Sequence, residues 1–212
     1  GDMLGERGLW FKMSFFEGSA RVPLMIAAPG LDPRREETPV STIDVTPTLG
    51  ALAGVDISEI APWTDGENLV PLARGEGREA PVRIEYAAEG SQAPLVCLRQ
   101  DRWKYVHCEL DPPQLFDLSA DPHELRNLAE DPAHAEVAAG FAAQVAALWD
   151  MPAFDAEVRE SQARRWVVYE ALRNGAYYPW DFQPLQKASE RYMRNHMDLN
   201  VLEDSQRYPR GE

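Results

Sequence analysis

The feature that most constrains the fold is an unbroken apolar run at residues 22–28, which ends at Pro29-Gly30. Apolar and polar residues do not alternate in this run, so neither side of the segment suits water. Such a run is typical of a strand that is buried on both faces, as in a parallel sheet. The strand needs neighbours on both sides, and alone it would expose an edge that is prone to aggregate. We therefore expect the chain to be stable only with further polypeptide, either covalently joined or as an associated second chain.

A helix is predicted over residues 44–53, soon after the apolar run. Thr46 is its expected N-cap, Pro47 stands at its first position and Gly54 follows its end. A buried strand followed by a helix indicates an α/β domain. Residues 55–81 are rich in Gly, Pro and acids, and we predict a connection with little regular structure there.

A small antiparallel sheet is predicted next. Apolar alternation and turn residues indicate four strands, at residues 82–86, 95–98, 103–108 and 114–118. One helix is expected to begin at Asp131-Pro132 and to stop before Pro152, and a second helix is expected over residues 154–174. Residues 185–206 are a candidate for a last helix.

The composition argues against some kinds of partner. The 212 residues carry a net charge of −14 at pH 7, and both nucleic acid and an anionic membrane need a basic patch. No apolar run approaches the roughly 20 residues of a membrane span. Cys97 and Cys108 are too few for a disulfide framework. A bond between them across a hairpin is conceivable, and two reduced core thiols are favoured.

The residues by themselves contain no strong catalytic motif. The sequence has no P-loop, no G-x-S-x-G, no H-E-x-x-H and no pair of CxxC motifs. Its four histidines are scattered, and no two of them have the spacing of metal ligands. On these grounds alone, the sequence predicts an acidic α/β chain with a small second sheet.

An ordered series of short motifs resembles the sulfatase family. Residues 1–26 are similar to the segment that follows the Asp-His metal-ligand pair of sulfatases. The later motifs occur in the family's order: Asp44-Val45-Thr46-Pro47-Thr48-Leu49, Asp65-Gly66, Trp103-Lys104-Tyr105, Leu115-Phe116-Asp117-Leu118 and Asp121-Pro122-His123-Glu124-Leu125. The resemblance covers about residues 1–130. It implies an alkaline-phosphatase-like α/β fold with a mixed sheet between helices, a small antiparallel C-terminal sheet and a helical tail.

The resemblance implies hydrolysis of a sulfate ester. Sulfatases use a formylglycine, made from the cysteine or serine of a Cys-x-Pro-x-Arg type motif, together with a divalent cation. Neither Cys97 nor Cys108 stands in such a motif, and Asp2 is not one of the Asp-His ligands. We expect the formylglycine and the cation, which would be calcium, magnesium or manganese, in a part N-terminal to Gly1. This chain alone is then expected to be inactive and to hold no metal ligand.

Lys12 is the one catalytic residue that the resemblance assigns to this chain. It matches the family lysine that contacts the substrate sulfate near the ester oxygen. A compact ammonium there neutralises the charge that develops on the leaving oxygen. The alternative is a solvated loop lysine. Arg7 and Glu17-Gly18 depart from what many sulfatases have at these positions, which leaves the substrate preference open.

The tail indicates the substrate. Residues 154–210 resemble the C-terminal extension of choline-sulfatases, which implies choline sulfate as the substrate. A quaternary ammonium has no hydrogen-bond donor, so its site needs aromatic faces and carboxylates. The candidate substrate-binding residues are Glu89 and Asp198, with Glu203 and Asp204 as rivals of Asp198. For each of them, an ordinary exposed acid is the alternative.

These resemblances divide the chain into three parts. Residues 1–75 are the expected end of the α/β core, residues 76–153 a C-terminal subdomain of strands and a helix, and residues 154–212 the choline-sulfatase-type extension. The extension is expected to join the subunits of a homo-oligomer, the N-terminal part of the same enzyme is an implied partner, and the implied location is cytoplasmic. Two alternatives stay open: a phosphonate monoester hydrolase or phosphodiesterase of the same superfamily, and a non-catalytic assembly module.

Overall fold

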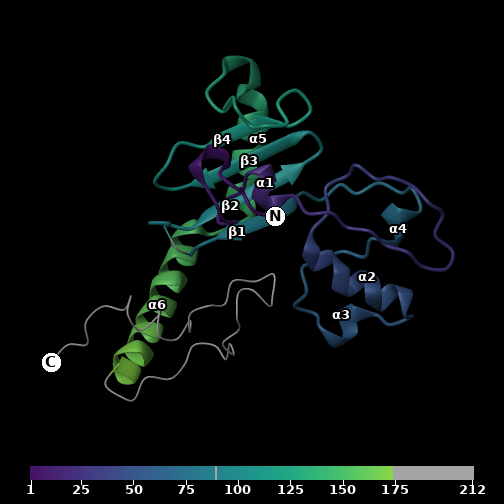
Figure 1. Cartoon of the computed structure of the whole chain (residues 1–212), viewed down its shortest axis with the longest axis horizontal. Coiled ribbons are helices and arrows are strands. Elements are labelled where there is room, and N and C mark those ends of the chain that lie inside the picture. Colours follow the sequence, from purple (N-terminus) through teal and green to yellow (C-terminus); the bar gives the residue numbers. More distant parts are fainter. Residues whose placement is uncertain (89, 174–212) are drawn as a thin grey trace, which may run out of the picture. The chain divides into compact units, whose positions relative to one another are not determined.

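A four-stranded antiparallel sheet organises the first of the two compact units of the chain, residues 1–156 and 157–212. The computed structural model describes residues 1–88 and 90–173. The strands lie in the order of the sequence: β1 (Val82–Tyr86), β2 (Leu95–Gln100), β3 (Trp103–Cys108) and β4 (Gln114–Asp117) (Figure 1). The four predicted strands and their antiparallel pairing are confirmed.

Both faces of this sheet are covered. Leu98 pairs with Tyr105, and Lys104 pairs with Phe116. Because side chains alternate along a strand, the first two share one face and the last two share the other. Tyr105 and Lys104 are both buried. Each face of the sheet therefore packs against another part of the chain.

Helix α5 (Ala135–Leu148) covers the first face (Figure 1). As predicted, Asp131 is a cap at this start: its carboxylate accepts a hydrogen bond from the backbone N–H of Ala133 and caps the 3-10 turn η3 (Pro132–His134), which leads directly into α5. The ring of Phe141 stacks on that of Tyr105, with 5.7 Å between their centroids. The core between helix and sheet also includes Val96, Leu98, Leu115, Leu128, Val145 and Met151.

Helix α6 (Met151–Arg173) follows after a short break. The predicted second helix is confirmed, and it begins three residues earlier than expected, because Pro152 fits the first turn of a helix, where a backbone N–H has no intrahelical partner. Met151 and Phe154 pack into the core of the first unit. From Glu157 onward the helix belongs to the second unit.

The N-terminal segment covers the second face of the sheet. It contains the 3-10 turn η1 (Glu6–Gly8). It also contains the single-turn helix α1 (Glu17–Ala20), which is labelled in Figure 1. Its Phe16 ring lies 6.4 Å from the ring of Phe116 on β4. Residues at the start of the chain thus pack on a sheet that forms about one hundred residues later.

Residues 41–78 contain η2 (Thr42–Asp44), α2 (Val45–Leu52), α3 (Ile57–Ile60) and α4 (Val70–Ala73). The predicted helix at 44–53 is confirmed, but Thr46 is not its cap. Ser41 and Asp44 form a capping box at η2, which leads directly into α2. Gly54 ends the helix with a φ of 73°, as expected. The predicted connection at 55–81 holds two short helices that the sequence did not indicate.

The strand predicted at residues 22–28 is wrong. The segment forms no strand, and its side chains from Val22 to Ile26 are exposed. A strand exists only where neighbouring chains accept and donate its backbone hydrogen bonds. An apolar pattern predicts burial, but it does not by itself supply those neighbours.

Cys97 and Cys108 are buried free thiols, as favoured, and they are not opposite one another in the β2–β3 register.

Across residues 1–88 and 90–173, no single helix is long and apolar enough to cross a membrane. Two consecutive helical stretches, Pro132–Leu148 and Met151–Leu172, pass the test of length and composition only when they are joined, and the chain bends by 53° between them.

Candidate functional site

Lys12 lies in a loop whose backbone is well held. The segment before it folds back on itself: the N–H of Met3 donates to the carbonyl of Phe11, and the N–H of Gly5 donates to that of Leu9. Gly5 permits this turn because its φ is 95°, in the left-handed region. The Lys12 carbonyl accepts hydrogen bonds from the Ser14 N–H, at 2.8 Å, and from the Ser19 hydroxyl.

The side chains around Lys12 face outward. Lys12 is itself exposed, and within the described residues its ammonium has no hydrogen-bond or ion-pair partner. Trp10, Phe11 and Met13 beside it are also exposed, at 66%, 70% and 52%. A cation between large exposed apolar groups is unusual for a simple surface loop. The arrangement could bring an ammonium to an anion at an apolar surface.

A buried ionic cluster lies beneath the same loop. Lys104 of β3 is 1% exposed, and its Nζ is 2.8 Å from Glu124 Oε1 and 2.5 Å from Glu17 Oε1. It also donates to the carbonyl of Phe15 at 2.8 Å. Glu124 completes the cluster by accepting from the backbone N–H of Glu17, at 2.7 Å. We call Lys104, Glu124 and Glu17 the anchor cluster.

Sequence reasoning missed the anchor cluster. It used Lys104 and Glu124 only as landmarks and Glu17 only as a departure. One signal was available, because Lys104 stands between Trp103 and Tyr105 in a strand now seen to be buried on both faces. A lysine in such a strand needs a partner for its charge. Only the tertiary structure identifies the partner.

Arg7 joins the turn η1 to the same region. Its guanidinium donates to the carbonyls of His123, at 2.7 Å, and of Glu124. It also lies 4.0 Å from the centre of the Phe16 ring. Glu124 has a φ of 55°, which is uncommon for a residue with a side chain and costs about 1 kcal/mol or more. The surrounding contacts must therefore hold Glu124 in place.

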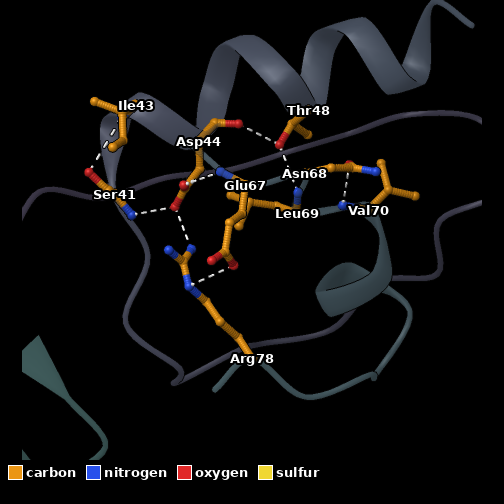
Figure 2. Close-up of polar contacts among 9 residues, drawn as sticks. All are labelled: Ser41, Ile43, Asp44, Thr48, Glu67, Asn68, Leu69, Val70 and Arg78. Atoms are coloured by element: carbon orange, nitrogen blue, oxygen red, sulfur yellow. Dashed lines mark hydrogen bonds and ion pairs between the residues drawn. The ribbon is translucent and has the colours of Figure 1, made fainter. Parts of the chain in front are cut away.

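A second buried carboxylate organises residues 41–78 (Figure 2). Asp44 has no exposed surface, and it accepts hydrogen bonds from the N–H groups of Ser41 and Glu67, at 2.7 and 2.8 Å. Its Oδ2 is 2.5 Å from Nη1 of Arg78, which also faces Glu67 at 3.4 Å. One turn along α2, Thr48 accepts from the N–H of Leu69. These contacts explain the Asp44 motif as a structural one.

The two predicted choline ligands, Glu89 and Asp198, lie outside the described residues, as do their rivals Glu203 and Asp204. Both assignments stay predictions.

The described residues do not fit the cation or the formylglycine of the family. They contain no group of three or more His, Cys, Asp or Glu side chains arranged to hold a metal ion. Cys97 is fully buried in β2, and this burial raises the pKa of its thiol to about 12, although Lys104 nearby acts in the opposite direction. A thiol with this pKa stays protonated at neutral pH and is inert.

Comparisons with known proteins settle the family. Residues 5–150 match the family described as N-sulphoglucosamine sulphohydrolase, C-terminal. The chain belongs to the sulfatase family. Residues 156–208 of this sulfatase chain match a second family, described as choline sulfatase enzyme C terminal.

Individual relatives agree with this assignment. The chain is 68% identical over 215 residues to a choline-sulfatase of Rhizobium meliloti, and the match covers 100% of this chain and 42% of that protein. It is 35% identical over 142 residues to arylsulfatase K of Gallus gallus, covering 61% of this chain and 26% of the relative. The sulfatase chain thus spans less than half of either relative.

A solved structure supports the fold. A sulfatase-like protein from Bacteroides thetaiotaomicron matches with a TM-score of 0.57 and 30% identity, over 68% of this chain and 33% of that one. The predicted C-terminal part of an alkaline-phosphatase-like sulfatase fold is therefore confirmed.

Proposed function

We propose that this chain is the C-terminal part of a choline-sulfatase, an enzyme that hydrolyses choline sulfate to choline and sulfate. The observation that carries the proposal is the match of residues 156–208 to the choline sulfatase C-terminal family, which adds a substrate class to the general sulfatase match. The 68% identity to a choline-sulfatase, over the whole chain, supports the same substrate.

In this proposal Lys12 meets the sulfate group of the substrate. Its exposure, between the exposed side chains of Phe11 and Met13, suits a group that reaches toward a ligand held by the rest of the enzyme. As the ester bond breaks, negative charge grows on the leaving oxygen, and an ammonium close to that oxygen stabilises it. The nucleophile, a formylglycine, and the ligands of a divalent cation are proposed to come from the part that this chain does not span.

The choline end requires a different environment. Glu89 and Asp198 are proposed to offset the charge of the quaternary ammonium, which has no hydrogen to donate. We also propose, from the resemblance to choline-sulfatases, that the enzyme is a homo-oligomer and is cytoplasmic.

The experiment compares variants of the complete enzyme on choline sulfate and on an uncharged aryl sulfate. Lys12→Ala is expected to lower kcat about 100-fold on both substrates, because both develop charge on the leaving oxygen. Glu89→Gln and Asp198→Asn are expected to raise KM about 10-fold for choline sulfate alone. Arg35→Ala and Glu76→Gln, which remove an exposed cation and an exposed acid, are the matched controls.

Two results would contradict parts of the proposal. Equal losses on both substrates for Glu89→Gln and Asp198→Asn would remove these residues from the choline site. Hydrolysis of the aryl sulfate, or of a phosphonate monoester, with a kcat/KM above that for choline sulfate would reject the substrate itself.

A further inference from the structure

The anchor cluster is the most unusual polar feature of the first unit. Lys104 and Glu124 are 1% and 3% exposed, in the middle of the layer between the sheet and the N-terminal segment. Three oxygens lie within 2.8 Å of Lys104 Nζ, and an ammonium has three hydrogen atoms to donate. Each hydrogen atom of this ammonium group therefore has an acceptor oxygen inside the protein.

Lys104 and Glu124 both contact one short segment of the N-terminal part. Lys104 Nζ contacts the Phe15 carbonyl and the Glu17 carboxylate, and Glu124 Oε2 accepts from the Glu17 N–H. These atoms belong to the first turn of α1 and to the residue before its N-cap, Phe16. The cluster thus fixes where helix α1 begins and how it is oriented on the sheet.

Helix α1 in turn holds the backbone of Lys12. The Ser19 side chain is buried, and its hydroxyl donates to the Lys12 carbonyl. The path runs from Lys104 through Glu17 and the helix to Ser19 and Lys12, and it lies within the first unit. A shift of α1 would move the Lys12 backbone with it.

Stability alone is a weak reason for this arrangement. Burying an ion pair removes both charges from water, and well-packed apolar side chains of similar size often stabilise a protein equally well. Phe116, on the same face of the sheet and paired with Lys104, shows that apolar residues suit this layer. An ionic cluster differs from an apolar one in that its hydrogen bonds require a particular geometry.

We propose that Lys104, Glu124 and Glu17 are positioning residues, which set the place of α1 and, through Ser19, of Lys12 for its contact with the sulfate ester. This inference rests on the proposed role of Lys12. It gives a function to two sulfatase motifs that the catalytic account leaves unused, the one that contains Lys104 and the one that contains Glu124.

Backbone hydrogen exchange tests, without any activity assay, whether the anchor cluster holds α1 in place. In the complete enzyme, Lys104→Met is expected to accelerate backbone hydrogen exchange in a peptide covering residues 15–20 at least about 10-fold, while exchange in α5 stays unchanged. Glu124→Gln, which keeps the size of the side chain, is a milder second variant with the same expected direction. Arg102→Met is the matched control, because it removes an ion pair with Asp117 at the end of β4.

The second test asks whether the cluster acts through Lys12. Lys104→Met or Glu124→Gln is expected to lower kcat on choline sulfate about 10-fold or more, because a displaced catalytic group loses its alignment. In a Lys12→Ala background, the same changes are expected to have little further effect on kcat. A purely structural role predicts losses that multiply.

The outcomes separate the two proposals. Unchanged exchange at residues 15–20 in both cluster variants, or losses that multiply with Lys12→Ala, would overturn the positioning role. A normal kcat for Lys12→Ala would overturn the proposed role of Lys12 and the positioning role that depends on it. The exchange measurement would still report in that case whether the cluster holds α1.

Discussion

Asp44 and Glu124 are motif residues whose buried carboxylates hold the surrounding backbone in place. Both are acids in motifs shared with sulfatases, and both are buried, with 0% and 3% exposure. Each accepts hydrogen bonds from backbone N–H groups and faces one buried cation, Arg78 or Lys104. In such a site a carboxylate organises the backbone around it, and its loss leaves a buried charge without its partner.

Replacing Asp44 by Asn is expected to destabilise the protein by about 3 kcal/mol, because Arg78 would keep its buried charge and lose its main partner. Urea unfolding of the parent and the variant measures the difference. Asp56→Asn is the matched control, since Asp56 caps the short helix α3 at the surface. Equal losses for the two variants would contradict the importance of burial.

The ionisation of Asp117 is expected to make the stability of the protein depend on pH. Its hydrogen bonds with the Arg102 guanidinium hold the pKa of its carboxyl below the usual range, and the N–H groups of Ser119 and Ala120 act in the same direction. A lowered folded-state pKa contributes stability above the unfolded-state value, about 4, and this contribution is lost as the pH falls through the folded-state value.

Compared with Asp117→Asn, the parent is therefore expected to be more stable at pH 7, by an amount that is constant down to about pH 5 and shrinks below about pH 4. Urea unfolding at a series of pH values from both proteins measures the difference. A difference that grows toward low pH would contradict the assignment of the shift to Arg102.

At the scale of the elements, packing decides positions that local sequence leaves open. Gly66, between α3 and α4, follows Asp65 in a motif of the family. A Cβ atom at Gly66 would lie 2.2 Å from the carbonyl oxygen of Ile43, far inside the normal contact distance. The motif glycine thus lets one segment of residues 41–78 pass against the backbone of another.

Gly66→Ala is expected to destabilise the protein by about 2 kcal/mol, because the added methyl meets backbone that cannot move aside easily. Gly77→Ala is the control: no atom lies within 4 Å of the place that its methyl group would take, and its φ is not in the left-handed region. Thermal unfolding of both variants distinguishes them. If Gly77→Ala were as harmful, close packing would not be the cause.

At the scale of the whole molecule, several segments expose large apolar side chains within the described residues. They include residues 9–13, residues 22–26, with Met25 at 91% exposure, and a group on α6 formed by Trp166, Val167, Val168 and Leu172. Monomeric proteins rarely expose large contiguous apolar patches. The chain spans 42% of the choline-sulfatase that it matches.

We expect the exposed apolar side chains of α6 to take part in the assembly of subunits. Removing residues 157–212 from the complete enzyme is expected to lower the number of subunits per particle, obtained from the mass measured by light scattering or sedimentation divided by the mass of one truncated chain. The cut follows Ala156 because Met151 and Phe154 belong to the core of the first unit. Val167→Glu in the untruncated enzyme is expected to weaken assembly in the same direction, since a buried charge opposes an apolar contact. An unchanged number of subunits in both would reject the tail as a subunit contact.

The sequence by itself determined the family, the four strands of the sheet, the Asp131 cap and the three longer helices α2, α5 and α6. These features depend on local patterns: alternation along strands, caps at helix starts, and motifs in a fixed order. The prediction of a strand at 22–28 failed because hydrogen-bonding neighbours are not a local property. The tertiary structure alone decided which residues meet Lys104 and Asp44, since burial of a charge selects a partner from anywhere in the chain. It also decided that the loop carrying Lys12 rests on a sheet formed about one hundred residues later, which no local pattern encodes.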